Sequence, residues 1–131
     1  MRPMAKEWLA SANGDLQTIH AIMGREDLTN VVAFHSQQCI EKCFKAILEE
    51  QQIVMPKIHN LVTLYHAIKK WLPISVDLDI LDLLNKLYTD SRYPSDMGWL
   101  PSGKPTLEDA HIFLSIAQNI YSYLDKLGPA K

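Results

Sequence analysis

Three short segments hold the side chains that could do chemistry in this chain. They are residues 34–45, with the sequence FHSQQCIEKCFK, residues 56–61 (PKIHNL) and residues 91–94 (SRYP). Amide, imidazole, carboxylate and cationic groups recur there beside aromatic rings. Folding alone does not need them, because the rest of the chain shows the ordinary apolar pattern of packed helices. We therefore expect these segments to assemble a polar pocket.

The first segment places four candidate residues on one face of a helix. Phe34, Gln38, Glu41 and Lys45 recur at spacings of four, three and four, which is the helical repeat. A solvated ion pair between Glu41 and Lys45, worth only ~0.3–0.5 kcal/mol, would explain those two residues without any function. Because Gln38 and Phe34 share their face, a ligand-binding role is the competing interpretation, and the spacing leaves both open.

The other two segments add a guanidinium and an imidazole at predicted helix ends. Arg92 precedes Tyr93 and Pro94, where proline disfavours helical geometry. Its planar guanidinium group would donate hydrogen bonds either to the last helical carbonyls or to a phosphate. We favour the phosphate, with Tyr93 stacking on a base. His59 would either belong to a helix cap formed with Asn60 or serve as an acid–base or phosphate-binding group. The pattern favours the cap, and His59 stays among the candidates.

Length and composition describe one globular domain over residues 1–131. Hydrophobic residues make up 47% of the chain and charged residues 21%, which is the globular range. The formal charge of −2 gives no reason to bind duplex DNA. No apolar stretch approaches the ~18 residues of a membrane span, and no secretory signal is visible. We expect a cytoplasmic protein without membrane contact.

The two cysteines, Cys39 and Cys43, lie four positions apart on the same predicted helix. A disulfide framework needs more cysteines, and a metal site needs further soft ligands at a recognisable spacing. We therefore expect two reduced, buried thiols, and we predict no metal and no cofactor.

Apolar residues recur at steps of three and four in five stretches, and no stretch alternates as a strand does. The predicted helices cover about residues 4–23, 27–52, 59–72, 77–92 and 106–127. We predict caps at Asn60 and Asp77 and a capping box from Thr106 to Asp109. Because short connections favour antiparallel packing, we predict an all-α, up-and-down four-helix bundle with an additional short helix.

Residues 94–105 lack a helical period and are rich in turn residues, so they form a predicted loop. Loops of about 12 residues are uncommon in compact bundles unless they are functional or mobile. Trp99 would either pin this loop to the bundle or cover the polar site.

These residues, in this order, resemble the HEPN family, whose name refers to nucleotide binding in higher eukaryotes and prokaryotes. The resemblance rests on positions in all three segments: Phe34, His35, Gln38, Glu41, Lys42, Lys45, His59, Asn60, Leu61, Arg92, Tyr93 and Pro94. It implies a bundle of four or five helices that usually dimerises and binds a nucleotide in its polar pocket. It also implies a minimal nucleotidyltransferase as partner, in a toxin–antitoxin-like pair.

The chain departs from the family pattern in two places. Many HEPN proteins are metal-independent ribonucleases that use an arginine followed, after four to six residues, by a histidine. The next histidine after Arg92 is His111, and Arg25 stands too far before His35. The acidic residue that usually follows the histidine of the second segment is Asn60 here. We therefore predict no catalytic residue.

The resulting hypothesis is a non-catalytic, homodimeric HEPN-type protein that binds a nucleotide or a nucleotidyltransferase partner. Its candidate ligand-binding residues are Phe34, Gln38, Glu41, Lys45, His59, Arg92 and Tyr93. Arg92 and Lys45 would hold phosphate, and Glu41 would orient Lys45. Gln38 would read a base or sugar edge, while one of the aromatic residues stacks. Two alternatives stay open: a metal-independent endoribonuclease, and a module that serves only dimerisation or protein interaction.

Overall fold

The computed structural model describes residues 1–54, 57–89 and 103–127. Its elements are five α-helices and two short 3₁₀ helices: α1 (Pro3–Ile22), Glu26–Leu28, α2 (Thr29–Glu50), α3 (Leu61–Ile68), Lys69–Trp71, α4 (Leu78–Thr89) and α5 (Leu107–Leu127). The predicted all-α bundle is confirmed. The predicted end of the fourth helix at Arg92 and most of the predicted loop, including Trp99, lie outside the described residues.

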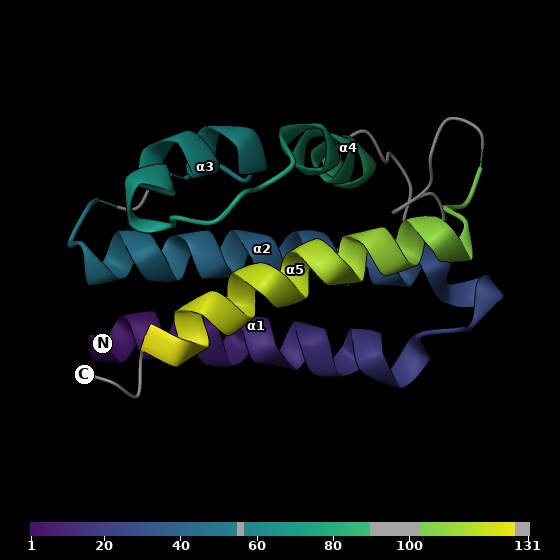
Figure 1. Cartoon of the computed structure of the whole chain (residues 1–131), viewed down its shortest axis with the longest axis horizontal. Coiled ribbons are helices and arrows are strands. Elements are labelled where there is room, and N and C mark those ends of the chain that lie inside the picture. Colours follow the sequence, from purple (N-terminus) through teal and green to yellow (C-terminus); the bar gives the residue numbers. More distant parts are fainter. Residues whose placement is uncertain (55–56, 90–102, 128–131) are drawn as a thin grey trace.

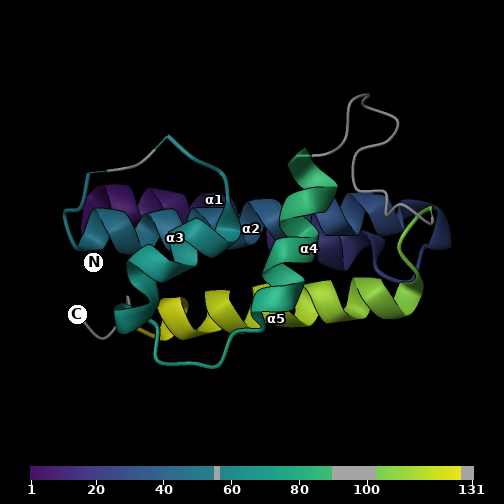
Figure 2. The same ribbon diagram turned by 90° about the horizontal axis from the view of Figure 1, so that it is seen from above.

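The helices form two layers. The three long helices α1, α2 and α5 lie side by side, and α1 runs in the opposite direction to the other two (Figure 1). The shorter helices α3 and α4 lie over α2 and α5, and α4 crosses the long helices steeply (Figure 2). As a result α2 contacts each of the other four helices.

Local sequence explains four of the helix ends. α1 stops at Ile22, and Gly24 follows in the left-handed region at φ +92°, which glycine adopts without steric cost. The Asn60 side chain accepts hydrogen bonds from two amides at the start of α3, and Asp77 does the same for α4. Thr106 and Asp109 bond to each other's backbone amides at the start of α5. The predicted caps at these three helices are confirmed.

The start of α2 has no side-chain cap, unlike the starts of α3, α4 and α5. A 3₁₀ turn, Glu26–Leu28, leads directly into the helix, and the residue before it, Leu28, makes no side-chain cap. Asp27 instead forms an ion pair with Arg25 at 2.7 Å. Because the backbone is already helical in the 3₁₀ turn, α2 begins without a polar cap.

The core lies among the three long helices and beneath α3 and α4. Its largest fully buried side chains include Phe44, Phe113, Leu16, Ile19, Ile40 and Leu48. The face of α2 that runs from Ala33 through Ile40 and Phe44 to Ile47 is buried along its length. Because helices cover α2 on several sides, part of its polar face is buried as well. Within the described ranges, none of the helices combines the length and apolarity that crossing a bilayer requires.

Candidate functional site

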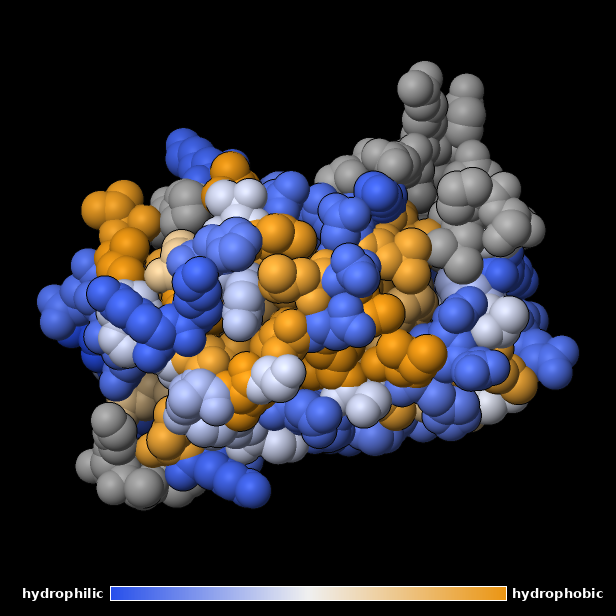
Figure 3. Space-filling view, turned by 45° about the horizontal axis from the view of Figure 1, so that its top comes forward, coloured by the Kyte–Doolittle hydropathy of each residue, from blue (hydrophilic) through white to orange (hydrophobic). Residues whose placement is uncertain are grey.

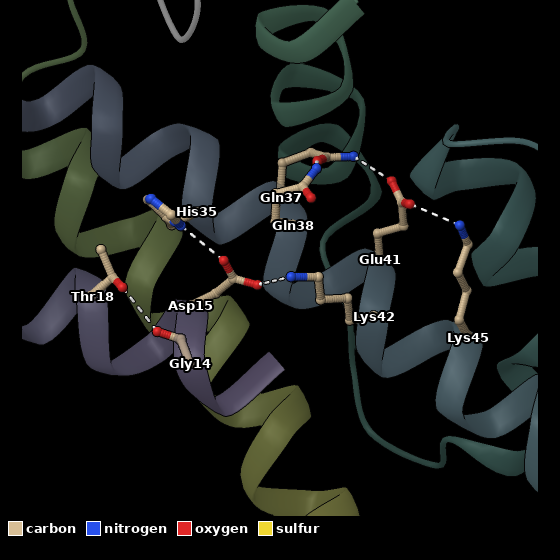
Figure 4. Close-up of polar contacts among 9 residues, drawn as sticks. All are labelled: Gly14, Asp15, Thr18, His35, Gln37, Gln38, Glu41, Lys42 and Lys45. Carbon is tan, nitrogen blue, oxygen red and sulfur yellow. Dashed lines mark hydrogen bonds and ion pairs between the residues drawn. The ribbon is translucent and has the colours of Figure 1, made fainter. Parts of the chain in front are cut away.

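One face of α2 carries a continuous polar strip, which we define as Phe34, His35, Gln37, Gln38, Glu41, Lys42 and Lys45. These positions follow one another around less than half of the helix circumference. α1 lies along one edge of the strip, and α3 and α4 lie along the other (Figure 1). The strip contains two separate groups of hydrogen-bonded side chains, each built around one carboxylate (Figure 4).

The first group, the Glu41 cluster, consists of Glu41 with Gln37, Gln38, Lys45 and His59. Glu41 is only 6% exposed, and three side chains contact its carboxylate. Gln37 Nε2 donates to Oε1 at 3.0 Å, and Lys45 Nζ donates to Oε2 at 2.9 Å. The His59 Nδ1 atom lies 2.9 Å from the same Oε2. One carboxylate thus joins a lysine, an imidazole and an amide.

These contacts set the charge of Glu41. Burial acts to raise the pKa of Glu41, but the hydrogen bonds from His59, Lys45 and Gln37 together bring that pKa below its ordinary value. The carboxylate is therefore ionised at neutral pH. An ionised Glu41 accepts a hydrogen bond from a protonated Nδ1, so it fixes the orientation of the His59 ring.

Gln37 and Gln38 extend this cluster along α2. Gln37 is fully buried, and its Nε2 atom also lies 3.4 Å from the carbonyl oxygen of His59. Gln38, which is half-buried, donates from Nε2 to the Gln37 Oε1 at 2.7 Å. Gln37 is not among the candidate residues predicted from the sequence. Its position four residues before Glu41, on the polar face, is the signal that identifies it.

Lys45 lies inside the molecule rather than on its surface. Its side chain is 10% exposed, and Nζ lies 5.4 Å from the centre of the Trp8 ring on α1. The interpretation of Glu41 and Lys45 as a solvated ion pair is therefore wrong. The reason is tertiary: α1 covers one side of the pair, and the segment that leads into α3 covers the other. Glu41 and Lys45 are in contact at 2.9 Å, and the role of Glu41 in orienting Lys45 stays a prediction.

His59 is the member of the Glu41 cluster that is exposed to solvent. Its side chain is 56% exposed, and Nε2 makes no hydrogen bond with the residues that the structure describes. The ring lies beside Tyr88 of α4, at 6.1 Å between centroids, and Tyr88 stacks on Phe34 at 6.0 Å. An oriented imidazole thus faces solvent at the end of an aromatic pair. Asn60 forms the predicted cap, while His59 binds Glu41 instead.

The second group, the Asp15 cluster, links α1 to α2. Asp15 is 7% exposed and accepts from Lys42 Nζ at 2.8 Å through Oδ2, while its Oδ1 lies 2.8 Å from His35 Nδ1. Figure 4 shows Asp15 between these two side chains. This cluster is not among the sites predicted from the sequence. An acidic residue within the apolar stripe of α1, between Ala12 and Ile19, is the signal that points to it.

The structure brings five of the seven candidate residues together. Gln38, Glu41, Lys45 and His59 belong to one hydrogen-bonded cluster, and Phe34 reaches it through the ring of Tyr88. The other two candidates, Arg92 and Tyr93, lie outside the described residues.

The described residues hold no group of three or more His, Cys, Asp or Glu side chains arranged to bind a metal ion. Cys39 and Cys43 are buried free thiols. Burial, with the neighbouring Cys39, raises the pKa of the Cys43 thiol well above its usual range. A thiol that stays protonated is a poor nucleophile and a poor metal ligand.

Fold and site together define an all-α helical bundle with a polar strip on its central helix. The family profile of the HEPN domain matches residues 5–127. The chain belongs to the HEPN family, as its sequence resemblance predicted. A comparison with curated proteins finds no match.

Two solved structures are similar over almost the whole chain. One is TT1696 from Thermus thermophilus, with a TM-score of 0.74 and 24% identity over 95% of this chain and 98% of that one. The other is ST0689, an archaeal HEPN homologue, with a TM-score of 0.66 and 25% identity over 97% of this chain and 98% of that one. The first similarity shows the shared fold.

Proposed function

We propose that this HEPN protein binds a nucleotide at the Glu41 cluster, without catalysing a reaction. One observation carries the proposal. The His59 imidazole is held on a buried, ionised carboxylate, yet its other nitrogen faces solvent beside two aromatic rings. Folding alone does not require an imidazole to be oriented toward water, whereas binding a phosphate next to a base does.

The geometry supports a division of roles among the candidates. His59 contacts the phosphate through Nε2, together with Arg92 as the sequence predicts. Glu41 and Lys45 hold His59, because both are nearly buried and bonded to each other.

The base stacks on the surface formed by Phe34 and Tyr88 or on Tyr93. The Gln38 carbonyl oxygen is left to accept a hydrogen bond from a base or sugar, since only its Nε2 is used by Gln37.

Isothermal titration calorimetry with AMP and ATP, with and without magnesium, tests this proposal. We expect His59→Ala and Arg92→Ala each to weaken binding about tenfold or more, the effect of losing one charge-assisted hydrogen bond. His66→Ala is the matched control. His66 lies on α3 and, like His59, is exposed, but its ring packs against Tyr65. Wild-type protein that binds neither nucleotide would overturn the proposal.

The same imidazole supports a second candidate function, metal-independent RNA cleavage. A neutral His59 with Nδ1–H on Glu41 presents Nε2 as a base, which is the arrangement of a histidine held by a carboxylate. It would take the proton of a ribose 2′-hydroxyl, the 2′-oxygen would attack phosphorus, and the 5′-oxygen would leave with a proton from solvent. Incubation of a short RNA in EDTA tests it: a 2′,3′-cyclic phosphate product, lost in His59→Ala, would favour this function.

For the assembly we propose a homodimer, with a minimal nucleotidyltransferase as a further partner, as the family resemblance implies. The homodimer has support on the face formed by α3, α4 and α5, where apolar side chains gather (Figure 3). Leu78 and Ile112 are exposed there at 40% and 42%, with Ile80 and Ile116 half-buried beside them. A second copy of the chain would remove these side chains from water.

A further inference from the structure

The Asp15 cluster repeats the chemistry of the Glu41 cluster. In each cluster a nearly buried carboxylate binds one lysine Nζ and one histidine Nδ1, at 2.8 Å for Asp15 and 2.9 Å for Glu41. In each, the lysine and the carboxylate balance one another's charge. In each cluster the second ring nitrogen of the histidine, Nε2, is left without a partner among the described residues.

His35 is the counterpart of His59. Its side chain is 25% exposed, and within the described ranges its Nε2 atom has no hydrogen-bond partner. A buried ion pair adds little net stability, because the cost of removing both charges from water offsets their attraction. What the Asp15 carboxylate does beyond this pair is to hold the His35 ring, whose Nδ1 lies 2.8 Å from Oδ1.

A row of rings joins the two histidines. The centroid of His35 lies 5.2 Å from that of Phe34, Phe34 stacks on Tyr88 at 6.0 Å, and Tyr88 lies 6.1 Å from His59. Two imidazoles, each oriented by its own carboxylate, thus stand at the two ends of an aromatic surface. Gln38 of the Glu41 cluster and Lys42 of the Asp15 cluster both lie on the same strip of α2, and both are half-buried.

From this arrangement we infer a second anion-binding subsite at His35 and Lys42. With two subsites, the strip binds a nucleotide that carries two phosphates, one on each side of its ribose. The ligand class is a nucleoside 3′,5′-bisphosphate, with one phosphate at His59 and the other at His35. Lys42 supports the second phosphate, because only one of its three N–H donors is used by Asp15. The base covers Phe34 and Tyr88. This inference rests on the proposed function and specifies its ligand.

Calorimetry with AMP and with adenosine 3′,5′-bisphosphate tests the second subsite. We expect the bisphosphate to bind wild-type protein at least about tenfold more tightly than AMP, the factor that one charge-assisted hydrogen bond gives. His35→Ala should bring the bisphosphate down to the affinity of AMP and leave AMP itself unchanged. His111→Ala, which removes an exposed histidine from α5, should change neither.

A second measurement uses only wild-type protein, so it does not depend on whether a variant folds. In NMR spectra of wild-type protein, the ring resonances of His35 should shift much more with the bisphosphate than with AMP, while those of His59 shift to a similar extent with both. A purely structural role for the Asp15 cluster predicts a different result. His35→Ala would then lower the melting temperature and leave the ratio of the two affinities intact.

The outcomes separate this inference from the proposed function. AMP that binds through His59, with no gain for the bisphosphate and no shift of His35, would overturn the second subsite alone. If neither compound binds wild-type protein, the proposed function fails and the inference fails with it.

Discussion

At the scale of single residues, a carboxylate without water stays ionised only when other donors replace the water. Glu41 has three such donors, and their combined effect exceeds that of burial on its pKa. Lys45 is equally dependent on Glu41, because its ammonium group is nearly buried. The residues of this cluster are therefore stable only as a set.

We expect Glu41→Gln to lower the free energy of unfolding by about 3 kcal/mol at neutral pH, because the change leaves the Lys45 charge buried without its partner. Urea denaturation followed by circular dichroism measures the change. Asp82→Asn is the matched control: Asp82 pairs with Lys86 at the same helical spacing, but both side chains are more than half exposed. The control should cost less than about 0.5 kcal/mol, and equal losses in the two variants would contradict a role for burial.

The pH dependence of stability follows from the same residue. The folded protein lowers the pKa of Glu41 below its ordinary value of 4.5, so the ionised form stabilises the fold above that pH. This contribution is lost as the pH falls from about 4.5 through the lower, folded pKa. The stability difference between wild type and Glu41→Gln should therefore be full near neutral pH and shrink in acid. Urea titrations across this range that show a constant difference would refute the assignment.

At the scale of elements, short helices position the groups that complete the site. α3 has only eight residues, and isolated helices of this length are marginal in water. Its N-terminus is held by Asn60, which accepts from the amides of Val62 and Thr63. Because His59 directly precedes this cap, the same backbone geometry that starts α3 also carries the imidazole to Glu41.

We expect Asn60→Ala to cost about 1 kcal/mol of stability, the usual value of an N-cap side chain. Hydrogen exchange should become faster at the amides of Val62 and Thr63, which lose their acceptor. Nucleotide affinity should fall as well, since the position of His59 becomes less fixed. Asn60→Asp keeps an acceptor at the cap and should retain slow exchange. If Asn60→Ala left exchange unchanged, the cap would not control the start of α3.

At the scale of the whole molecule, the central position of α2 decides where function can lie. One side of α2 packs into the core, and the polar strip lies between α1 and the upper layer of α3 and α4 (Figures 1 and 2). On the apolar face, Leu78 lies at the start of α4 and Ile112 lies on α5, whereas Tyr88 of the site lies near the end of α4 (Figure 3). A dimer formed through that face would therefore leave the strip open to a ligand.

We expect the wild-type protein to sediment as a dimer of its 14.9 kDa chain, and Ile112→Lys to sediment as a monomer. A lysine at this exposed position would place charge in an apolar contact without disturbing the core. Val54→Lys is the control, because Val54 is 90% exposed and belongs to the segment after α2. Analytical ultracentrifugation gives the masses. A dimeric Ile112→Lys variant would exclude this face as the interface.

How much of the protein could be predicted depends on the range of the interactions involved. Helical periodicity and capping are local, so the sequence alone determined the five helices and the caps at Asn60, Asp77 and Thr106. It also determined that Glu41 and Lys45 share a face, because they lie one turn apart on the same helix.

Only the tertiary structure decided what these groups contact. His59 meets Glu41 across 18 residues of chain, and Asp15 meets His35 and Lys42 across 20 and 27 residues. Helix packing sets such contacts, and spacing along the chain carries no information about them. Helix packing likewise buries the ion pair between Glu41 and Lys45, which spacing along the chain predicts to be solvated. Sequence thus determined the helices and their polar face, while packing decided which of their charges are buried and which imidazole nitrogens remain open.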